Sequence, residues 1–457
     1  MKKIFLILIL LPAIFSVYSQ DADSIMIKKI YNDALSDKTG YENLRYLTKK
    51  IGGRVTGSPQ AAAAVEWSKQ VLQNMKPDTV WLQQMTVPTW IRGEKEICSV
   101  SSSIFGDCHL SICALGTSVG TGIDGLFGKV IEVKNFEELK NLGSKNVTGK
   151  IVFFNRAADP TFFYTFDAYG GVADQRVHGA SEAAKYGAIG VIVRSLTLAD
   201  DDFPHTGVMH YEKGIPQIPA IAVSTKGADF LSGWLKKDPQ LNLFFRTTCR
   251  QDADGISFNV IAELKGSEFP DQIITLGGHI DSWDIGEGAH DDGAGIIQTM
   301  EVLRLYKKLG IKPKHTIRFV MFMDEEIAQS GARKYAEQVE LKKEKLFFAV
   351  ASDRGGTTPT AFSIKTDSIS FNHVLKYRKY FEPYGIYHYL TDGSGVDIGP
   401  LKKFNIPLIV LVPDSQRYLD YHHAGNDTLE NVNPRELQLG SASLASLIFL
   451  LDKYGFK

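Results

Sequence analysis

The chain has 457 residues, of which 44% are hydrophobic and 23% are charged. This is the composition of a soluble globular protein, and the length is sufficient for two or three domains. The formal net charge of −1 lacks the basic excess typical of nucleic-acid binding, so we expect no nucleic-acid partner.

Residues 1–19 have the pattern of a secretory signal peptide. A short basic start is followed by an apolar run over residues 4–17 and by the small residue Ser19. The alternative is a membrane anchor, but the apolar run contains Pro12 and is shorter than the roughly 17–25 residues that a spanning helix needs. We therefore expect cleavage before Gln20, export to the periplasm or the exterior, and no membrane span in the mature protein.

The first part of the mature chain alternates between helix and strand patterns. Residues 23–34 and 61–72 are predicted to form helices, separated by a glycine-containing loop, and residues 80–87 a strand. A glycine-rich stretch over residues 115–128 is typical of a domain boundary.

The texture of the sequence changes after this boundary. Short apolar strands are predicted over residues 130–133, 151–154, 189–193 and 220–223, with one helix around 180–186. We expect an inserted, mainly β domain over residues 121–239. It divides a larger α/β domain into residues 20–120 and 240–457.

Some side chains in and near the insert have two interpretations. The aromatic run over residues 162–166 could line a substrate cleft, but we expect it in the core of the insert. Three histidines could be metal ligands or ordinary loop and core residues: His178, His205 and His210. Four cysteines are expected as buried thiols or one structural disulfide: Cys98, Cys108, Cys113 and Cys249.

The second half of the chain has the pattern of an α/β unit with buried parallel strands. Apolar runs over residues 273–276 and 317–323 flank an amphipathic helix over 296–307. Strand, helix and strand in this order form a βαβ unit, whose strands point the same way. The predicted domain is a mixed central sheet flanked by helices, completed by strands over 346–350 and 406–412 and a C-terminal helix over 434–454.

Acidic and histidine side chains follow the predicted strands. They are His279, Asp281, Asp291, Asp292, Glu325, Glu326, Asp353 and His423. The carboxyl ends of strands form the ligand crevice of an open α/β sheet, so we expect these groups together. Crowded carboxylates would repel each other, and divalent cations are the least costly way to hold them. Two imidazoles with carboxylates favour zinc over calcium or magnesium, with manganese and cobalt as alternatives.

A two-metal site needs a bridging carboxylate and a free carboxylate that accepts a proton from the attacking water. The adjacent Glu325 and Glu326 suit this division, because one can bind a metal while the other faces the substrate. Any one acidic pair alone could be a solvated surface. Their shared position at predicted strand ends argues for a site.

These motifs resemble the M28 zinc peptidases, in particular the branch with an inserted protease-associated (PA) domain. The resemblance covers nearly the whole mature chain and includes the loop 54–58, the insert, residues 205–207, and residues 421–423 with 427–428. It implies a zinc exopeptidase fold, two Zn²⁺ per chain, and a dipeptide or short peptide as substrate. A homodimer would fit the family, but no interface can be identified from the sequence.

The resemblance also implies a division of the metal ligands. His279 and Asp353 would hold one zinc, Glu326 and His423 the other, and Asp291 would bridge the two. A cis peptide bond is implied after Asp291.

The remaining implied roles belong to residues beside the metals. Glu325 would be the catalytic base and then the acid that protonates the leaving amine. Asp281 would hydrogen-bond to the free ring nitrogen of His279 and so fix its tautomer. Arg354, next to the ligand Asp353, could reach a substrate carboxylate or pair with a neighbouring acid.

We therefore expect an exported di-zinc exopeptidase. Recognition of the free amino group would make it an aminopeptidase, recognition of the carboxylate a carboxypeptidase, and recognition of both a dipeptidase. Two non-peptidase alternatives remain, a glutaminyl cyclase and a non-catalytic receptor-like protein of the same fold.

Overall fold

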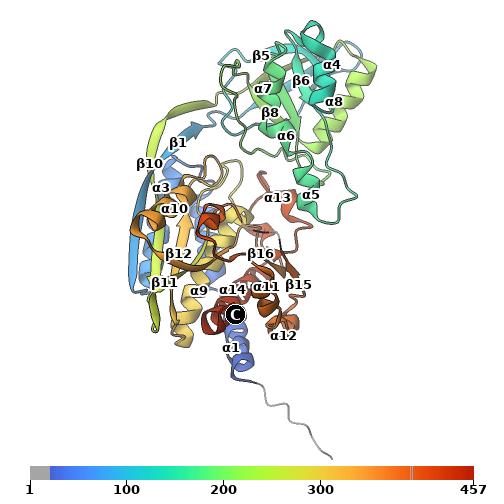
Figure 1. Cartoon of the computed structure of the whole chain (residues 1–457). Coiled ribbons are helices and arrows are strands. Elements are labelled where there is room, and N and C mark those ends of the chain that lie inside the picture. The colour runs from blue at the N-terminus through green and yellow to red at the C-terminus, as the bar shows by residue number, and fades with distance from the viewer. Residues whose placement is uncertain (1–20, 392, 394, 457) are drawn as a thin grey trace, which may run out of the picture.

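The computed structural model describes residues 21–456 with the exception of 392 and 394. The expected signal peptide and its cleavage site before Gln20 lie outside these residues. Within them, the chain forms two units, each built around an eight-stranded sheet (Figure 1). No helix in the described part is long and apolar enough to cross a membrane.

The first sheet combines a strand that precedes the second unit in the sequence with strands that follow it. Its strands, in spatial order, are β1 (Thr79–Ile91), β10 (Arg250–Leu264), β12 (His315–Phe322), β11 (Phe269–His279), β13 (Lys345–Ala351), β16 (Leu408–Pro413), β14 (Pro359–Lys365) and β15 (His388–Leu390). The four strands β12, β11, β13 and β16 are parallel to one another. Their carboxyl ends therefore meet at one edge, as the βαβ pattern predicts.

Helices pack on both faces of this sheet. One face carries α1 (Ala22–Ser36), α2 (Thr39–Tyr46), α3 (Pro59–Asn74), α9 (Ala294–Leu309) and α14 (Pro434–Tyr454), and the other carries α10 (Ser330–Lys342) and η4 (Gly399–Phe404). The remaining helical segments of this unit are η1 (Leu47–Ile51), η2 (Ala289–Gly293), α11 (Ser368–Leu375), α12 (Arg378–Phe381), η3 (Glu382–Tyr384), α13 (Tyr418–Tyr421) and η5 (Leu429–Asn431).

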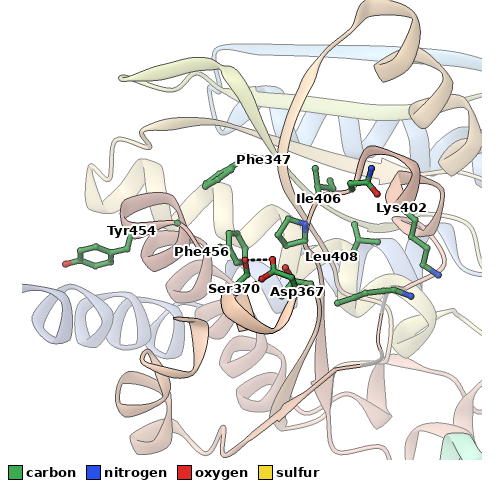
Figure 2. A pocket seen from close by; sticks show the side chains of 13 residues that line it. Phe347, Asp367, Ser370, Lys402, Ile406, Leu408, Tyr454 and Phe456 are labelled. Atoms are coloured by element: carbon green, nitrogen blue, oxygen red, sulfur yellow. Dashed lines mark hydrogen bonds between the residues drawn. The ribbon is translucent and has the colours of Figure 1, made fainter. Parts of the chain in front are cut away.

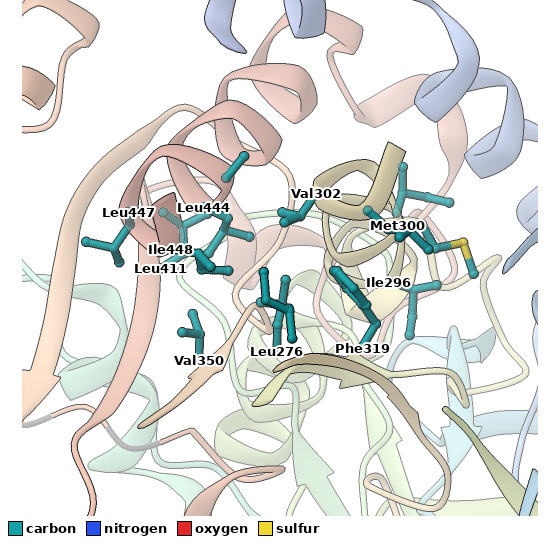
Figure 3. Close-up of a cluster of buried hydrophobic side chains, with 14 of the residues drawn as sticks. Leu276, Ile296, Met300, Val302, Phe319, Val350, Leu411, Leu444, Leu447 and Ile448 are labelled. Atoms are coloured by element: carbon teal, nitrogen blue, oxygen red, sulfur yellow. The ribbon is translucent and has the colours of Figure 1, made fainter. Parts of the chain in front are cut away.

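The main core lies between the sheet and helices α9 and α14. Figure 3 shows Leu276 and Phe319 of the strands facing Ile296 and Met300 of α9, and Leu444 of α14 lies beside them. Burial of each such side chain contributes about 1.5–3 kcal/mol. Helix α9 is buried on nearly all sides, because α14, α1 and α2 cover the surface that an amphipathic helix would expose.

The second unit consists of residues between β1 and β10. Its strands, in spatial order, are β3 (Gly106–His109), β2 (Ile97–Ser102), β9 (Asn242–Arg246), β5 (Leu126–Val133), β6 (Ile151–Phe154), β7 (Gly190–Arg194), β8 (Ala220–Val223) and β4 (Ile112–Ala114). Its helices are α4 (Phe136–Val147), α5 (Thr165–Gly170), α6 (Ala173–Val177), α7 (Gly179–Ala184) and α8 (Thr225–Lys237). The unit therefore has more helix than the expected mainly β domain.

The boundaries of the second unit differ from the expected 121–239. Strands β2, β3 and β4 precede residue 121, and β9 follows residue 239. The glycine-rich stretch after β4 is not a linker between domains. It crosses from β4, at one end of this sheet, to β5 in its middle, and this crossover explains the misplaced boundary. The four cysteines are free thiols, and Cys98, Cys113 and Cys249 are buried.

The aromatic run beside α5 lies on the surface. Phe162, Phe163 and Tyr164 are 47%, 76% and 56% exposed, so their expected place in the core of the insert is wrong. The segment extends toward the first unit instead. The Thr165 hydroxyl donates a 2.9 Å hydrogen bond to the carbonyl of Ser415, just before α13.

Candidate metal centre

The predicted ligands meet at the carboxyl edge of the parallel strands. His279 is the last residue of β11, and Asp353 lies two residues beyond the end of β13. Glu326 comes shortly after β12. Asp291 lies in η2, directly before α9, and His423 follows α13. The parallel sheet thus brings together side chains that are far apart in the sequence.

Asp291 lies in the middle of this cluster. Its Oδ1 is 3.2 Å from Nε2 of His279, and its Oδ2 is 3.3 Å from Nε2 of His423. Oδ1 of Asp353 is 3.5 Å from the same His279 nitrogen, and Oε2 of Glu326 is 3.0 Å from the same His423 nitrogen. The five side chains form two histidine–carboxylate pairs joined by one carboxylate, which is the donor arrangement for two bridged cations.

The five side chains are suited to bind divalent cations, because some of their buried carboxylate oxygens have no hydrogen-bond donor among the described residues. Oδ2 of Asp291 and Oε1 of Glu326 are buried and accept no hydrogen bond from the described residues. Such oxygens in a crowd of carboxylates need a positive partner. Ligand atoms of His279, Asp291 and Glu326 lie within 4.8 Å of one another, a spacing that one ion can span.

The main chain after Asp291 is closely packed, and at Gly295 there is no room for a side chain. The Asp292 carboxylate accepts hydrogen bonds from the main-chain N–H groups of His279 (3.0 Å) and Gly295 (3.1 Å), and it also lies with His279 and Asp353 in a group that could hold an ion. A Cβ atom at Gly295 would lie 1.8 Å from the carbonyl oxygen of Ser352. The peptide bond between Asp291 and Asp292 is cis, as the resemblance implies.

Asp281 contacts the main chain of both glutamates as well as the ring of His279. Its carboxylate accepts hydrogen bonds of 3.2 Å from the main-chain N–H of Glu325 and of Glu326, and another from the hydroxyl of Thr56. Nδ1 of His279 donates to the main-chain carbonyl of Asp281 at 3.1 Å. Oδ1 of Asp281 lies 3.7 Å from the same Nδ1, so the carbonyl and the carboxylate of Asp281 both face this nitrogen and leave Nε2 of His279 free for a metal.

Glu325 remains free of the ligand pairs. Its side chain is partly exposed beside the cluster. Burial raises the pKa of Glu325 well above its ordinary value; His279 opposes this shift, whereas the negative charges of Asp353 and Glu326 add to it. A carboxylate with a raised pKa next to a metal cluster is suited to accept a proton from water and return it.

Asp397 is a residue at the centre that the sequence reasoning missed. It is 1% exposed, and neither carboxylate oxygen accepts a hydrogen bond from a described residue. Burial raises its pKa well above the ordinary value, against the pull of His279, and the charges of Asp353 and Asp281 raise it further. The sequence marked only a loop here, because nothing local indicates that the loop folds back onto the centre.

Two more residues support the loops that carry the ligands. The Asp427 carboxylate accepts hydrogen bonds from the main-chain N–H groups of His290 (2.7 Å) and Asp291 (3.1 Å). Arg54 is fully buried and donates to the carbonyls of Ile280, Glu287 and Gly288. In the sequence, Arg54 and Asp427 were recognisable only as members of motifs shared with the M28 peptidases, and no role was predicted for either residue.

The candidate histidines of the insert are not ligands in this arrangement. Nδ1 of His205 is 2.8 Å from the carbonyl oxygen of His422, which holds the second unit to the loop of His423. Among the described residues, His178 and His210 belong to no group that could hold a metal. His422 stacks on His423 with ring centroids 3.6 Å apart, and it could join Asp291 and His423 around one ion.

A separate pocket of about 820 Å³ lies at the other edge of the sheet (Figure 2). Its walls include Phe347, Leu408 and Phe456, near the amino ends of β13 and β16. Asp367 on its rim caps α11 through the main-chain N–H groups of Ile369 and Ser370. Lys365 and Lys402 also line the pocket, and among the described residues no group that could hold a metal lies there.

Comparison with known proteins supports a common origin over the whole chain. The model of Peptidase family M28 matches residues 259–448. Carboxypeptidase Q of Bos taurus is 30% identical over 434 residues, which cover 95% of this chain and 89% of that protein. Carboxypeptidase Q of Homo sapiens is 30% identical over 427 residues, covering 93% and 88%.

Solved structures agree with this likeness. The structure of a peptidase M28 precursor from Shewanella amazonensis SB2B has a TM-score of 0.90 and 33% identity, covering 94% of this chain and 97% of that chain. A zinc aminopeptidase from Bacillus subtilis has the same fold at 18% identity, with a TM-score of 0.64 and coverage of 90% and 94%.

Proposed function

The chain belongs to peptidase family M28, and we propose from this premise that it is an exported di-zinc exopeptidase that hydrolyses dipeptides or short peptides. The likeness to carboxypeptidase Q over 95% of the chain supports this choice within the family. The signal-peptide pattern over residues 1–19 supports export.

The observation that carries the proposal is the central position of Asp291 between two histidine–carboxylate pairs. His279 and Asp353 would hold one zinc, and His423 and Glu326 the other. Bound zinc would polarise the scissile carbonyl and lower the pKa of a water molecule.

The protein's own groups handle the proton. Glu325 accepts the proton of the attacking water and delivers it to the nitrogen of the leaving amine. Asp281 fixes the direction of Glu325 through the hydrogen bond to its main-chain N–H. The neighbouring Glu326 N–H is bound to the same carboxylate, so base and ligand are held as one unit.

The test uses the purified chain from Gln20 onward beside Glu325→Gln, with Glu337→Gln on the exposed face of α10 as control. The substrates are an unblocked dipeptide, its N-acetyl form, its C-terminal amide and an aminoacyl chromogenic amide, and zinc is determined on the same samples. We expect about two zinc ions per chain. We also expect turnover of the unblocked dipeptide, an inactive Glu325→Gln that keeps its zinc, and an active control.

The other outcomes separate the alternatives. Cleavage of the chromogenic amide would identify an aminopeptidase on longer substrates. No turnover of any substrate with zinc bound would reject the small-peptide proposal, and a product cyclised at an N-terminal glutamine would identify a glutaminyl cyclase.

A further inference from the structure

We propose that Arg354 binds the free α-carboxylate of the substrate, and that the second unit positions Arg354 for this task through Phe166. The inference rests on the proposed function and narrows it: the substrate would have one residue beyond the scissile bond, ending in a free carboxylate.

Arg354 lies directly beside the metal centre. It follows Asp353, whose Oδ1 is 3.5 Å from Nε2 of His279. The two residues lie beyond the end of β13, at the edge where all the predicted ligands meet. A peptide whose scissile carbonyl sits at the metals extends by only about 3.3–3.6 Å per residue. An arginine whose main chain adjoins a proposed metal ligand can therefore reach a terminal carboxylate only when the leaving part is short.

The guanidinium of Arg354 is held by an aromatic ring of the second unit. Its Cζ atom lies 4.9 Å from the centre of the Phe166 ring in α5. Phe166 in turn stacks on Tyr418 of α13, with ring centroids 5.6 Å apart and an angle of 22°. Tyr418 is buried, so the stack of three groups has a fixed base. Stacking on a ring face leaves the edge of the guanidinium available for hydrogen bonds.

The contact between α5 and the first unit does not depend on this stack alone. The Thr165 hydroxyl donates to the carbonyl of Ser415, and the Gln416 side-chain amide donates to the carbonyl of Phe163, each at 2.9 Å. These bonds hold α5 against the segment before α13, where the Phe166 ring stacks on Tyr418. The second unit thereby contributes to substrate recognition through Phe166, which packs on Arg354.

Arg354 has no ion pair or hydrogen bond with any residue that the structure describes. Arg417, on the same side of the centre, differs in this respect because it pairs with Glu436 at 3.3 Å. The acids nearest to Arg354 along the chain and at the centre are those predicted to bind zinc. A planar guanidinium with a free edge matches a carboxylate, which it can bind through two parallel hydrogen bonds.

The experiment compares an unblocked dipeptide with its C-terminal amide on the zinc-loaded enzyme. The variants are Arg354→Gln, Arg354→Lys and Phe166→Leu, and Arg417→Gln is the matched control. We expect the wild type to prefer the free acid, and Arg354→Gln to lower kcat/KM for the free acid by about 30-fold or more, mainly through KM. Its activity on the amide should stay unchanged. Arg354→Lys should retain part of the preference for the free acid over the amide. Phe166→Leu should lose part of this preference, and Arg417→Gln should keep all of it.

Three results would overturn the inference while the peptidase proposal stands. They are equal wild-type rates on acid and amide, an equal loss on both substrates in Arg354→Gln, and no loss in that variant. Zinc content and circular dichroism of each variant would reveal a folding defect. If Arg354→Gln is misfolded, Arg354→Lys tests the inference instead, because it keeps the positive charge. If the wild type cleaves neither dipeptide, the proposed function itself fails and this inference fails with it.

Discussion

Oδ2 of Asp427 accepts a 3.1 Å hydrogen bond from the main-chain N–H of Asp291. The two carboxylate oxygens of Asp291 face His279 and His423. Asp427 therefore fixes the main chain of the residue proposed to bridge the two metals. Burial raises the pKa of Asp427 to about 7, and the charge of Asp291 adds to this shift. Supporting groups of this kind orient metal ligands without touching the metal.

Asp427→Asn should weaken zinc binding. An asparagine offers one acceptor where the carboxylate offers two, and its amide would face a main-chain N–H of His290 or Asp291. We expect zinc affinity to fall roughly 10- to 100-fold with the fold retained, measured by titration against a competing chelator. Asp367→Asn makes the same change at the cap of α11, away from the centre, and should bind zinc as the wild type does. Unchanged affinity in Asp427→Asn would show that the support is dispensable.

The sequence indicated which proposed ligands would meet at the centre but not which residues support them, for a physical reason. His279, Glu326 and Asp353 lie at or just beyond the ends of buried strands, and parallel strands leave little choice about where those ends meet. Asp397 and Asp427 lie on loops, whose paths depend on packing between distant segments. The local pattern around them is that of ordinary surface loops.

The same limit explains the errors in the second unit. A glycine-rich stretch can separate two domains or cross between two strands of one sheet, and only the pairing of β4 with β8 distinguishes these cases. The exposed run that begins at Phe162 lies beside the segment before α13, to which Phe163 and Thr165 are hydrogen-bonded. Its composition alone resembles that of a core.

Asp397→Asn should stabilise the zinc-free protein. The carboxylate is buried without a described hydrogen-bond partner, and burial raises its pKa together with the charges of Asp353 and Asp281. Removal of this charge should raise the free energy of unfolding by about 1 kcal/mol or more. The gain should shrink when zinc is bound, because zinc compensates the negative charge. Thermal unfolding with and without a chelator measures both effects, and exposed Asp254→Asn should show neither. A lower melting temperature of zinc-free Asp397→Asn would contradict the account.

The stability of the zinc-free protein should fall as the pH rises from about 6.5 to 8. Below this range the buried His205, His290 and His422, whose pKa values are lowered by burial, contribute stability that grows with pH. Burial raises the pKa values of Asp324 and Asp427 to about 7. Burial alone would lower the pKa values of His279 and His423, but Asp353 and Glu326, respectively, raise them well above the ordinary value. A raised pKa means that the folded state binds more protons than the unfolded state. The stabilisation from these groups is complete at low pH and is lost as the pH rises toward the folded-state pKa values.

Zinc should reverse this trend. The metal displaces the protons on its ligands, so its contribution to stability should grow over the same pH range. Melting temperatures at pH 5, 6.5 and 8, with zinc or with chelator, would test both slopes. A zinc-free protein that becomes more stable toward pH 8 would show that the acidic cluster is not strained by its own charge.

Gly295→Ala should disrupt the start of α9 and with it the centre. The new Cβ would lie 1.8 Å from the Ser352 carbonyl oxygen and 2.4 Å from Oδ1 of Asp292. The Ser352 main chain adjoins the proposed ligand Asp353, and the Asp292 side chain accepts hydrogen bonds from the main-chain N–H groups of His279 and Gly295, so neither group can retreat without disturbing the centre. We expect a loss of about 2–3 kcal/mol in urea unfolding, together with weaker zinc binding. Gly233→Ala is the matched control, because its Cβ meets nothing within 4 Å in α8 and should stabilise that helix by about 0.5–1 kcal/mol. Equal stability of Gly295→Ala and wild type would mean that Asp292 and Ser352 can move apart without loss of the fold. The five ligands would then be held less rigidly than their distances imply.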